Sequence, residues 1–121
     1  MKDARAFLPL SPQQFHILLA LADGPLHGYG VIRDIDERTA GGMRLGTGTL
    51  YTALARLDAL TLLEETNRRP SAKDDDERRR YYQLTTLGRA VLKAETARLE
   101  TLVRHAHRKG VAGGPAWSRG K

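Results

Sequence analysis

The chain has 121 residues, enough for one modest domain with a single hydrophobic core. Its net charge of +6 and isoelectric point of about 10.1 favour a polyanionic partner, and the absence of cysteine excludes disulfides and thiolate metal sites. No apolar run approaches the roughly 18 residues that a membrane span needs, and the N-terminus does not resemble a signal peptide, so we expect a soluble cytoplasmic protein.

Much of the excess positive charge lies at the end of the sequence. Five of the 20 lysines and arginines fall between residues 104 and 121, where no acidic residue occurs, and the other 15 nearly balance the 14 acidic residues. The overall charge is therefore weak support for nucleic-acid binding, and the local placement of charges has to decide.

Two helices are predicted before residue 40. In LSPQQF, Ser11 is typical of an N-cap, Pro12 of the first helical position and Gln14 of a capping box. This helix should end at DGP, residues 23–25, and bury Phe15, Leu18, Leu19 and Ala22. A second helix is expected over about 28–39, ending at AGG and burying Ile32 and Ile35.

A third helix is predicted from GTGTLYTALARLDAL, residues 46–60, with Thr47 as its N-cap. One face of this helix is an apolar stripe that consists of Leu50, Ala53, Leu54, Leu57 and Leu60. The opposite face carries small or polar side chains.

Two strands follow, at 62–67 and 79–84, and form a β-hairpin with a long polar tip. The alternation places Tyr82 and Leu84 on one face. It places Arg79, Tyr81 and Gln83 on the other face.

Thr85 is the predicted cap of a final helix that runs to about Arg108 or Lys109. One stripe, with Leu87, Val91 and Ala94, suits packing within the chain's own domain, and a second stripe has the spacing of a coiled-coil seam. Two stripes in so small a domain indicate a partner chain. The seam residues, our candidate dimer interface, are Leu92, Thr96, Leu99, Val103 and Ala106.

This order of elements is mainly α with a small β-hairpin, an α+β fold, and is typical of a winged helix-turn-helix domain with an appended dimerisation helix. We assign residues 1–84 to the DNA-binding domain, 85–109 to the dimerisation helix and 110–121 to a flexible basic tail. The third helix is then the recognition helix and the hairpin tip is the wing, where an acidic run, DDDE, would form the solvated outermost turn. The candidate DNA-binding residues are Thr47, Thr49, Tyr51, Thr52, Arg56, Arg68, Arg69, Lys73, Arg78 and Arg79.

Three stretches resemble the PadR-like winged-helix transcriptional regulators: HGYGVI at 27–32, GTLYTALARLDAL at 48–60 and RRYYQLTTLGR at 79–89. The resemblance covers about residues 10–108 and implies a homodimeric repressor that binds a palindromic operator in double-stranded DNA. It also implies that a small hydrophobic effector lowers the DNA affinity. The resemblance implies that family members holding aromatic drugs use aromatic residues at the dimer interface. The only tryptophan of this chain, Trp117, lies in the tail, so we assign no effector-binding residues.

One residue departs from the family pattern. Thr61 stands where the family usually has a glycine that closes the recognition helix. A β-branched residue is poorly suited to the left-handed conformation required there, so we expect this helix end to be built differently.

Other functions are less well supported. A winged-helix module that dimerises and recruits a protein without reading DNA is the main alternative, and an RNA-binding domain lacks an aromatic stacking platform. The sequence has no dinucleotide fingerprint, phosphate-binding loop or nucleophile elbow, so we expect neither an enzyme nor a cofactor. His105 and His107 point to different helix faces and make a poor metal pair, and His27 is expected to have a structural role at a helix entrance.

Overall fold

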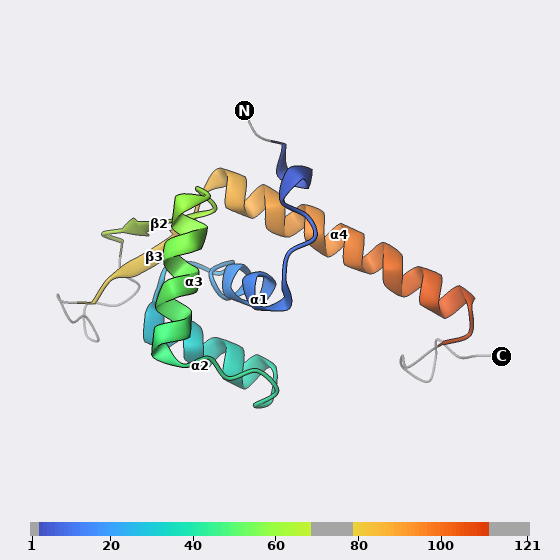
Figure 1. Cartoon of the computed structure of the whole chain (residues 1–121), viewed down its shortest axis with the longest axis horizontal. Coiled ribbons are helices and arrows are strands. Elements are labelled where there is room, and N and C mark those ends of the chain that lie inside the picture. Colours follow the sequence, from blue (N-terminus) through green and yellow to red (C-terminus); the bar gives the residue numbers. More distant parts are fainter. Residues whose placement is uncertain (1–2, 69–78, 112–121) are drawn as a thin grey trace.

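The computed structural model describes residues 3–68 and 79–111. Figure 1 shows the long last helix running past the other helices, with a small sheet at its N-terminal end. The elements are a 3-10 helix η1 (Ala4–Phe7), α1 (Pro12–Ala20), β1 (Leu26–His27), α2 (Gly28–Arg38), α3 (Thr47–Ala59), β2 (Leu63–Thr66), β3 (Tyr81–Leu84) and α4 (Thr86–Arg108).

Helix α1 begins with the capping box predicted from the sequence. The Gln14 N–H donates to Ser11 Oγ at 3.1 Å, and Gln14 Oε1 accepts from the Ser11 N–H at 3.0 Å. The buried set differs from the predicted stripe, because α1 packs against both α2 and α4 and therefore buries more than one side. Ile17, Leu18, Ala20 and Leu21 are buried, whereas Phe15, Leu19 and Ala22 are only partly buried.

Helix α3 shows the predicted leucine stripe but not the predicted cap. Leu50, Leu54 and Leu57 are fully buried. The first helical turn closes on Gly46, whose carbonyl accepts from the Leu50 N–H at 2.9 Å, so Thr47 is the first helical residue. The expectation that Thr47 is the N-cap is wrong by one residue, and no side chain caps this helix.

The end of α3 overturns another expectation. Thr61 adopts the left-handed conformation with φ 62°, the conformation thought unsuitable for it. The Thr61 N–H bonds to the Asp58 carbonyl at 2.9 Å and the Leu62 N–H bonds to the Leu57 carbonyl at 3.0 Å, which is a Schellman motif. These two bonds and the burial of Leu62 hold Thr61 in place despite its branched side chain.

The sheet has three antiparallel strands in the order β1-β3-β2, so the predicted hairpin gains a third strand. Leu26 pairs with Tyr82 and His27 with Tyr81. Tyr81 was expected on the outer face but is buried, because the His27 ring meets it edge to face at 5.3 Å between centroids.

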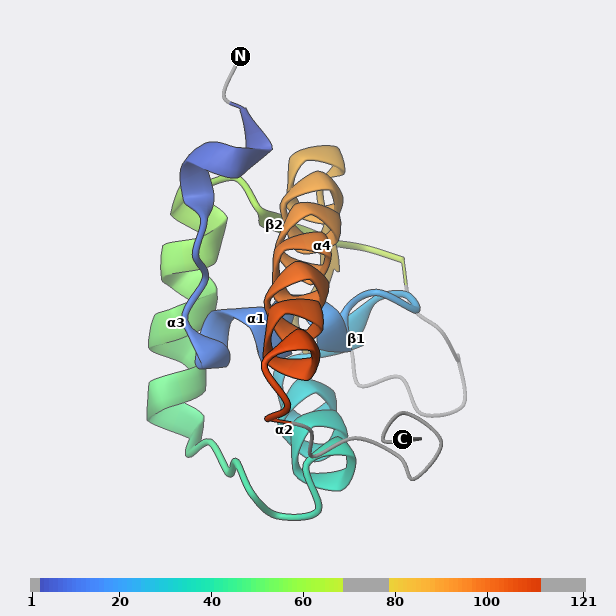
Figure 2. The same cartoon turned by 90° about the vertical axis from the view of Figure 1, so that its right-hand side faces the viewer.

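Helix α4 begins where predicted, with Thr85 Oγ1 accepting from the Gly88 N–H at 2.9 Å. Its first turns, through Val91 and Leu92, belong to the core shared with the other helices. Figure 2 shows the N-terminal segment lying alongside α4, and η1 packs against this helix. The C-terminal half of α4 projects beyond the rest of the described chain (Figure 1).

Candidate nucleic-acid interface

Helix α3 carries most of the described candidate residues. Thr49, Thr52 and Arg56 are exposed on its outer face, and Thr47 is exposed at its N-terminal end. The leucine stripe on the opposite face packs into the core, so this face is presented on a rigid support. One acidic residue, Asp58, is also exposed near its C-terminal end.

A groove of about 570 Å³ runs between α3 and the start of α1. Thr49, Thr52 and Arg56 line it from α3, and Gln13 and Gln14 line it from α1. Sequence reasoning missed the contribution of α1, although the capping box that positions Gln14 was recognised. The groove therefore presents amide, hydroxyl and guanidinium groups, the side-chain groups that pair with base edges.

The first turn of α3 leaves its backbone amides open. Gly46 offers no side-chain acceptor, and Thr47, Gly48 and Thr49 are exposed. An uncapped helix N-terminus with small side chains attracts a phosphate through the free N–H groups and the helix dipole.

Tyr51 points to a different surface from Arg56. It lines a hollow of about 320 Å³ together with His27, Tyr29, Arg79 and Arg80. An added Cβ at Gly28 would lie 2.5 Å from the Tyr51 hydroxyl oxygen, so the glycine makes room for this ring. The structure thus separates the predicted residues into a groove around Thr52 and Arg56 and a hollow around Tyr51 and Arg79.

His27 connects the sheet to this hollow. Its Nδ1 accepts from the Gly30 N–H at 3.1 Å and caps α2, as expected for a structural histidine at a helix entrance. Its Nε2 lies 3.1 Å from Arg79 Nη1. Burial, followed by the positive charges of Arg79 and Arg33, lowers the pKa of His27 below its ordinary value.

The described parts of the wing hold their arginines near acidic or amide groups. Arg68 Nη1 donates to Gln83 Oε1 at 3.4 Å, and Arg80 Nη1 lies 4.0 Å from Glu65 Oε2. The exposed ion pair of Arg80 and the long hydrogen bond of Arg68 to a neutral amide are both weak, so a phosphate could replace either contact. Arg69, Lys73 and Arg78, together with the acidic DDDE run, lie outside the described residues.

The candidate dimer seam is only partly free on this single chain. Leu92 is 7% exposed and packs in the chain's own core, whereas Val103 is 54% exposed. Thr96, Leu99 and Val103 line an apolar groove with Phe15 of α1, and Ala106 lies partly buried further along. Glu95, beside this seam, is buried and was not singled out from the sequence.

Neither a metal centre nor a membrane span is found in residues 3–68 and 79–111. No group of three or more histidine, aspartate or glutamate side chains comes together there in a way that could hold a metal ion. None of the helices in these ranges is both long enough and apolar enough to cross a bilayer.

A helix-turn-helix followed by a small antiparallel sheet defines a winged helix-turn-helix protein. The model of the transcriptional regulator PadR-like family matches residues 17–94. The chain is 35% identical over 91 residues to the transcriptional regulator Rv3488 of Mycobacterium tuberculosis, with 75% of this chain and 78% of that protein covered. The chain belongs to the PadR-like family of transcriptional regulators.

Other relatives differ more in length or sequence. An uncharacterised 37.1 kDa protein of transposon TN4556 from Streptomyces fradiae is 43% identical over 93 residues, which cover 74% of this chain and 23% of that protein. A PadR-like transcription factor from Bacteroides fragilis matches with a TM-score of 0.64 and 26% identity, covering 83% of this chain and 89% of that one. Bacillus subtilis PadR in complex with operator DNA matches with a TM-score of 0.56 over 69% of this chain and 46% of that one, and at 20% identity this likeness shows the fold alone.

Proposed function

We propose that this protein is a homodimeric, sequence-specific DNA-binding repressor that reads a palindromic operator. The observation that carries the proposal is the exposed outer face of α3, where Thr52 and Arg56 lie along one groove with Gln13. A helix with one buried leucine stripe and small exposed side chains fits the major groove, and an arginine there pairs with guanine. Thr52 and Arg56 are assigned to base edges.

Phosphate contacts would come from both sides of this groove. The open amides at Thr47 and Thr49 suit one phosphate, and Tyr51 with Arg79 suits another. Beyond β2, we assign Arg68 to the DNA backbone. We propose the same role for Arg69, Lys73 and Arg78. These contacts would fix the position of α3 on the duplex without reading sequence.

Pairing of two chains through α4 is part of the proposal. The projecting half of this helix exposes Val103, which lines the apolar groove that reaches Phe15. A second α4 in antiparallel or parallel contact would cover this surface and set the spacing of the two recognition helices. The repressor role and its release by a small hydrophobic molecule rest on the family resemblance.

The test is fluorescence anisotropy of a labelled duplex taken from DNA upstream of the protein's own coding sequence, compared with a scrambled duplex across a salt series. We expect discrimination of at least about 1000-fold. Arg119→Ala combined with Lys121→Ala, which removes tail charge but leaves the described surface intact, should retain this discrimination.

Two variants separate base reading from phosphate binding. Arg56→Ala should cost about 1–3 kcal/mol on the specific duplex only, whereas Arg79→Ala should weaken both duplexes alike. Equal, steeply salt-dependent binding to both duplexes by the wild type, lost with the tail charges, would instead favour a protein-interaction module.

A further inference from the structure

The two ring nitrogens of His27 have different partners, and these partners determine where the ring hydrogen lies. Nδ1 faces the Gly30 N–H at 3.1 Å, and a backbone N–H can only donate. Nδ1 must therefore carry the lone pair, and in the neutral ring Nε2 carries the hydrogen. This tautomer is assigned from the hydrogen-bond network.

The hydrogen on Nε2 faces another donor. Arg79 Nη1 lies 3.1 Å from Nε2, and a guanidinium has no acceptor. The two groups cannot hydrogen-bond to each other in this state. Their arrangement is complementary to an oxygen atom that lies in front of both and accepts from each.

The walls of the hollow have the chemistry of an anion site. Tyr29, Tyr51 and Arg80 complete its lining, and none of these described lining residues is acidic. Glu65 approaches Arg80 only from outside this set, at 4.0 Å. Because Gly28 has no side chain, the Tyr51 hydroxyl lies close to the backbone next to His27.

We propose that His27 donates its Nε2–H to a phosphodiester oxygen of bound DNA, in a site that Arg79 and the Tyr51 hydroxyl complete. The assignment rests on the proposed DNA-binding function and adds a residue that the sequence placed in a purely structural role. The hollow lies where β1 leads into α2 and where α3 passes, and Arg79 lies two residues before the start of β3. A backbone strand running from the groove of α3 towards the wing would pass it.

His27 would thus join two tasks through one ring. Nδ1 caps α2, the first helix of the helix-turn-helix, while Nε2 holds the DNA backbone against it. The lowered pKa of His27 is consistent with a neutral ring at pH 7, so the contact is a hydrogen bond rather than an ion pair.

A crossed pair of substitutions separates these tasks. His27→Asn keeps a good N-cap acceptor but is too short to reach the position of Nε2. His27→Gln reaches that position with an amide donor but is a poor N-cap. Both are compared in the full-length chain with the wild type and Arg79→Ala, by thermal unfolding and by anisotropy with a short duplex that the wild type selects from a random-sequence pool.

We expect His27→Asn to keep the cap of α2 and to unfold only slightly below the wild-type temperature, because the ring contact with Tyr81 is lost. It should bind the duplex about tenfold more weakly, as for one lost hydrogen bond to a charged group. Its salt dependence should match the wild type, because a neutral donor displaces no counterion. Arg79→Ala should lower the slope of log affinity against log salt by about 0.9. His27→Gln, which loses the cap as well as the ring contact, should unfold at a lower temperature than His27→Asn and keep most of the affinity.

Three other outcomes would overturn the phosphate contact. Wild-type affinity in His27→Asn, or losses in the two variants that follow their loss of stability, would overturn the phosphate contact while leaving DNA binding in place. If wild-type protein binds no duplex, both the contact and the proposed function fail. If inorganic phosphate alone shifts the His27 ring resonances and neither variant changes DNA affinity, the ligand is a free phosphate ion and the DNA assignment is wrong.

Discussion

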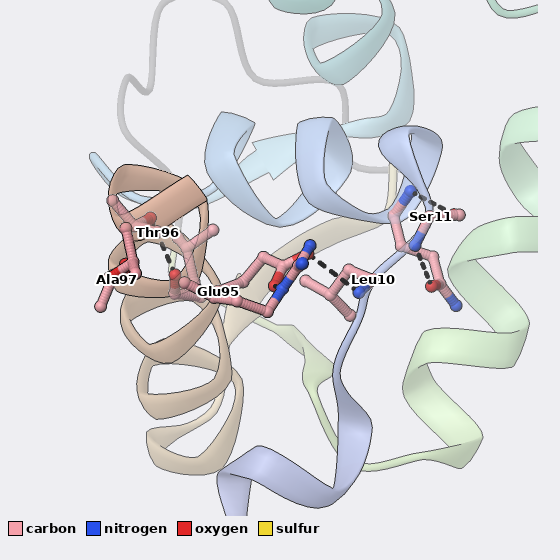
Figure 3. Close-up of polar contacts among 9 residues, drawn as sticks. Leu10, Ser11, Glu95, Thr96 and Ala97 are labelled. Atoms are coloured by element: carbon pink, nitrogen blue, oxygen red, sulfur yellow. Dashed lines mark hydrogen bonds and ion pairs between the residues drawn. The ribbon is translucent and has the colours of Figure 1, made fainter. Parts of the chain in front are cut away.

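The buried carboxylate of Glu95 accepts a hydrogen bond from the backbone N–H of Leu10 at 3.0 Å, across the gap between α4 and the start of α1 (Figure 3). Glu95 is 1% exposed, and Arg98 Nε and Nη2 donate to its two oxygens at 2.6 and 2.9 Å. A carboxylate with three such partners is satisfied despite its burial. Because Leu10 precedes the Ser11 cap, this cluster ties α4 to the helix that forms one wall of the α3 groove.

Replacement of Glu95 by glutamine should destabilise the fold. Glu95→Gln keeps the size of the side chain but removes the charge that pairs with Arg98, and one amide hydrogen would face the Leu10 or Arg98 donors. We expect a loss of about 2 kcal/mol in the free energy of unfolding, measured by urea denaturation. Glu37→Gln, exposed near the end of α2, should change it by less than about 0.5 kcal/mol. Equal small effects would mean that the cluster is energetically unimportant.

The same carboxylate should make the stability depend on acid pH. The hydrogen bond from Arg98 is the main cause that holds the pKa of Glu95 below its ordinary value of 4.5, opposed by burial. A lowered pKa in the folded state stabilises the protein above pH 4.5, and this contribution is lost as the pH falls through the folded-state pKa. The free energy of unfolding should therefore fall more steeply below this pH in the wild type than in Glu95→Gln. Parallel curves would contradict the assignment.

The left-handed residue at the end of α3 offers a stabilising substitution. Thr61 has φ 62°, and a branched side chain is strained there. Thr61→Gly should therefore raise the free energy of unfolding by about 1 kcal/mol, since the gain from relieved strain exceeds the entropy cost of glycine. The matched control is Ala55→Gly, at an exposed position in the interior of the helix, which should lose about 1 kcal/mol. A loss of stability in Thr61→Gly would indicate that the threonine side chain compensates for its conformation.

Much of this fold follows from local sequence signals, and the exceptions have specific causes. The caps at Ser11 and Thr85 and the leucine stripe of α3 are predictable because hydrogen bonds over three residues and a helical period determine them. The two-residue strand β1 is not, since only pairing with distant Tyr82 makes it a strand. The conformation of Thr61 is likewise imposed by the packing that follows it.

The candidate site was predictable in its residue types but not in its grouping. The sequence predicts that the side chains of Arg56 and Tyr51 both point outward from α3. Only the structure shows that they lie on separate surfaces with different neighbours. The involvement of Gln13 and the burial of Glu95 depend on contacts between α1, α3 and α4. The sequence holds one signal for the ion pair of Glu95, because Arg98 lies three residues later on the same helix.

Gly28 should contribute to DNA binding because of the space that it leaves for Tyr51. An added methyl group would lie 2.5 Å from the Tyr51 hydroxyl oxygen, so Gly28→Ala should push this partly exposed ring out of the hollow. We expect about 1 kcal/mol of lost DNA-binding free energy, the value of one hydrogen bond, with little change in thermal stability. Gly30→Ala is the control on the same helix, because its methyl group would meet Leu26 at 3.4 Å, an ordinary contact. If both variants bind DNA like the wild type, Tyr51 does not depend on this glycine.

A charge in the apolar groove of α4 should separate the proposed dimer. Val103 is 54% exposed and lines this groove, so Val103→Glu would place a carboxylate among the apolar side chains between the two chains. We expect dimerisation to weaken by at least about 2 kcal/mol, measured by sedimentation equilibrium, with unfolding of the separate chain little affected. Leu102→Glu, similarly exposed but outside the residues lining the groove, should have a smaller effect.

Because two half-sites are read together only by a dimer, Val103→Glu should also lose affinity for a palindromic duplex while keeping its weak binding to a single half-site. A wild-type monomer at all concentrations, or an equal response to the two substitutions, would contradict pairing through this face.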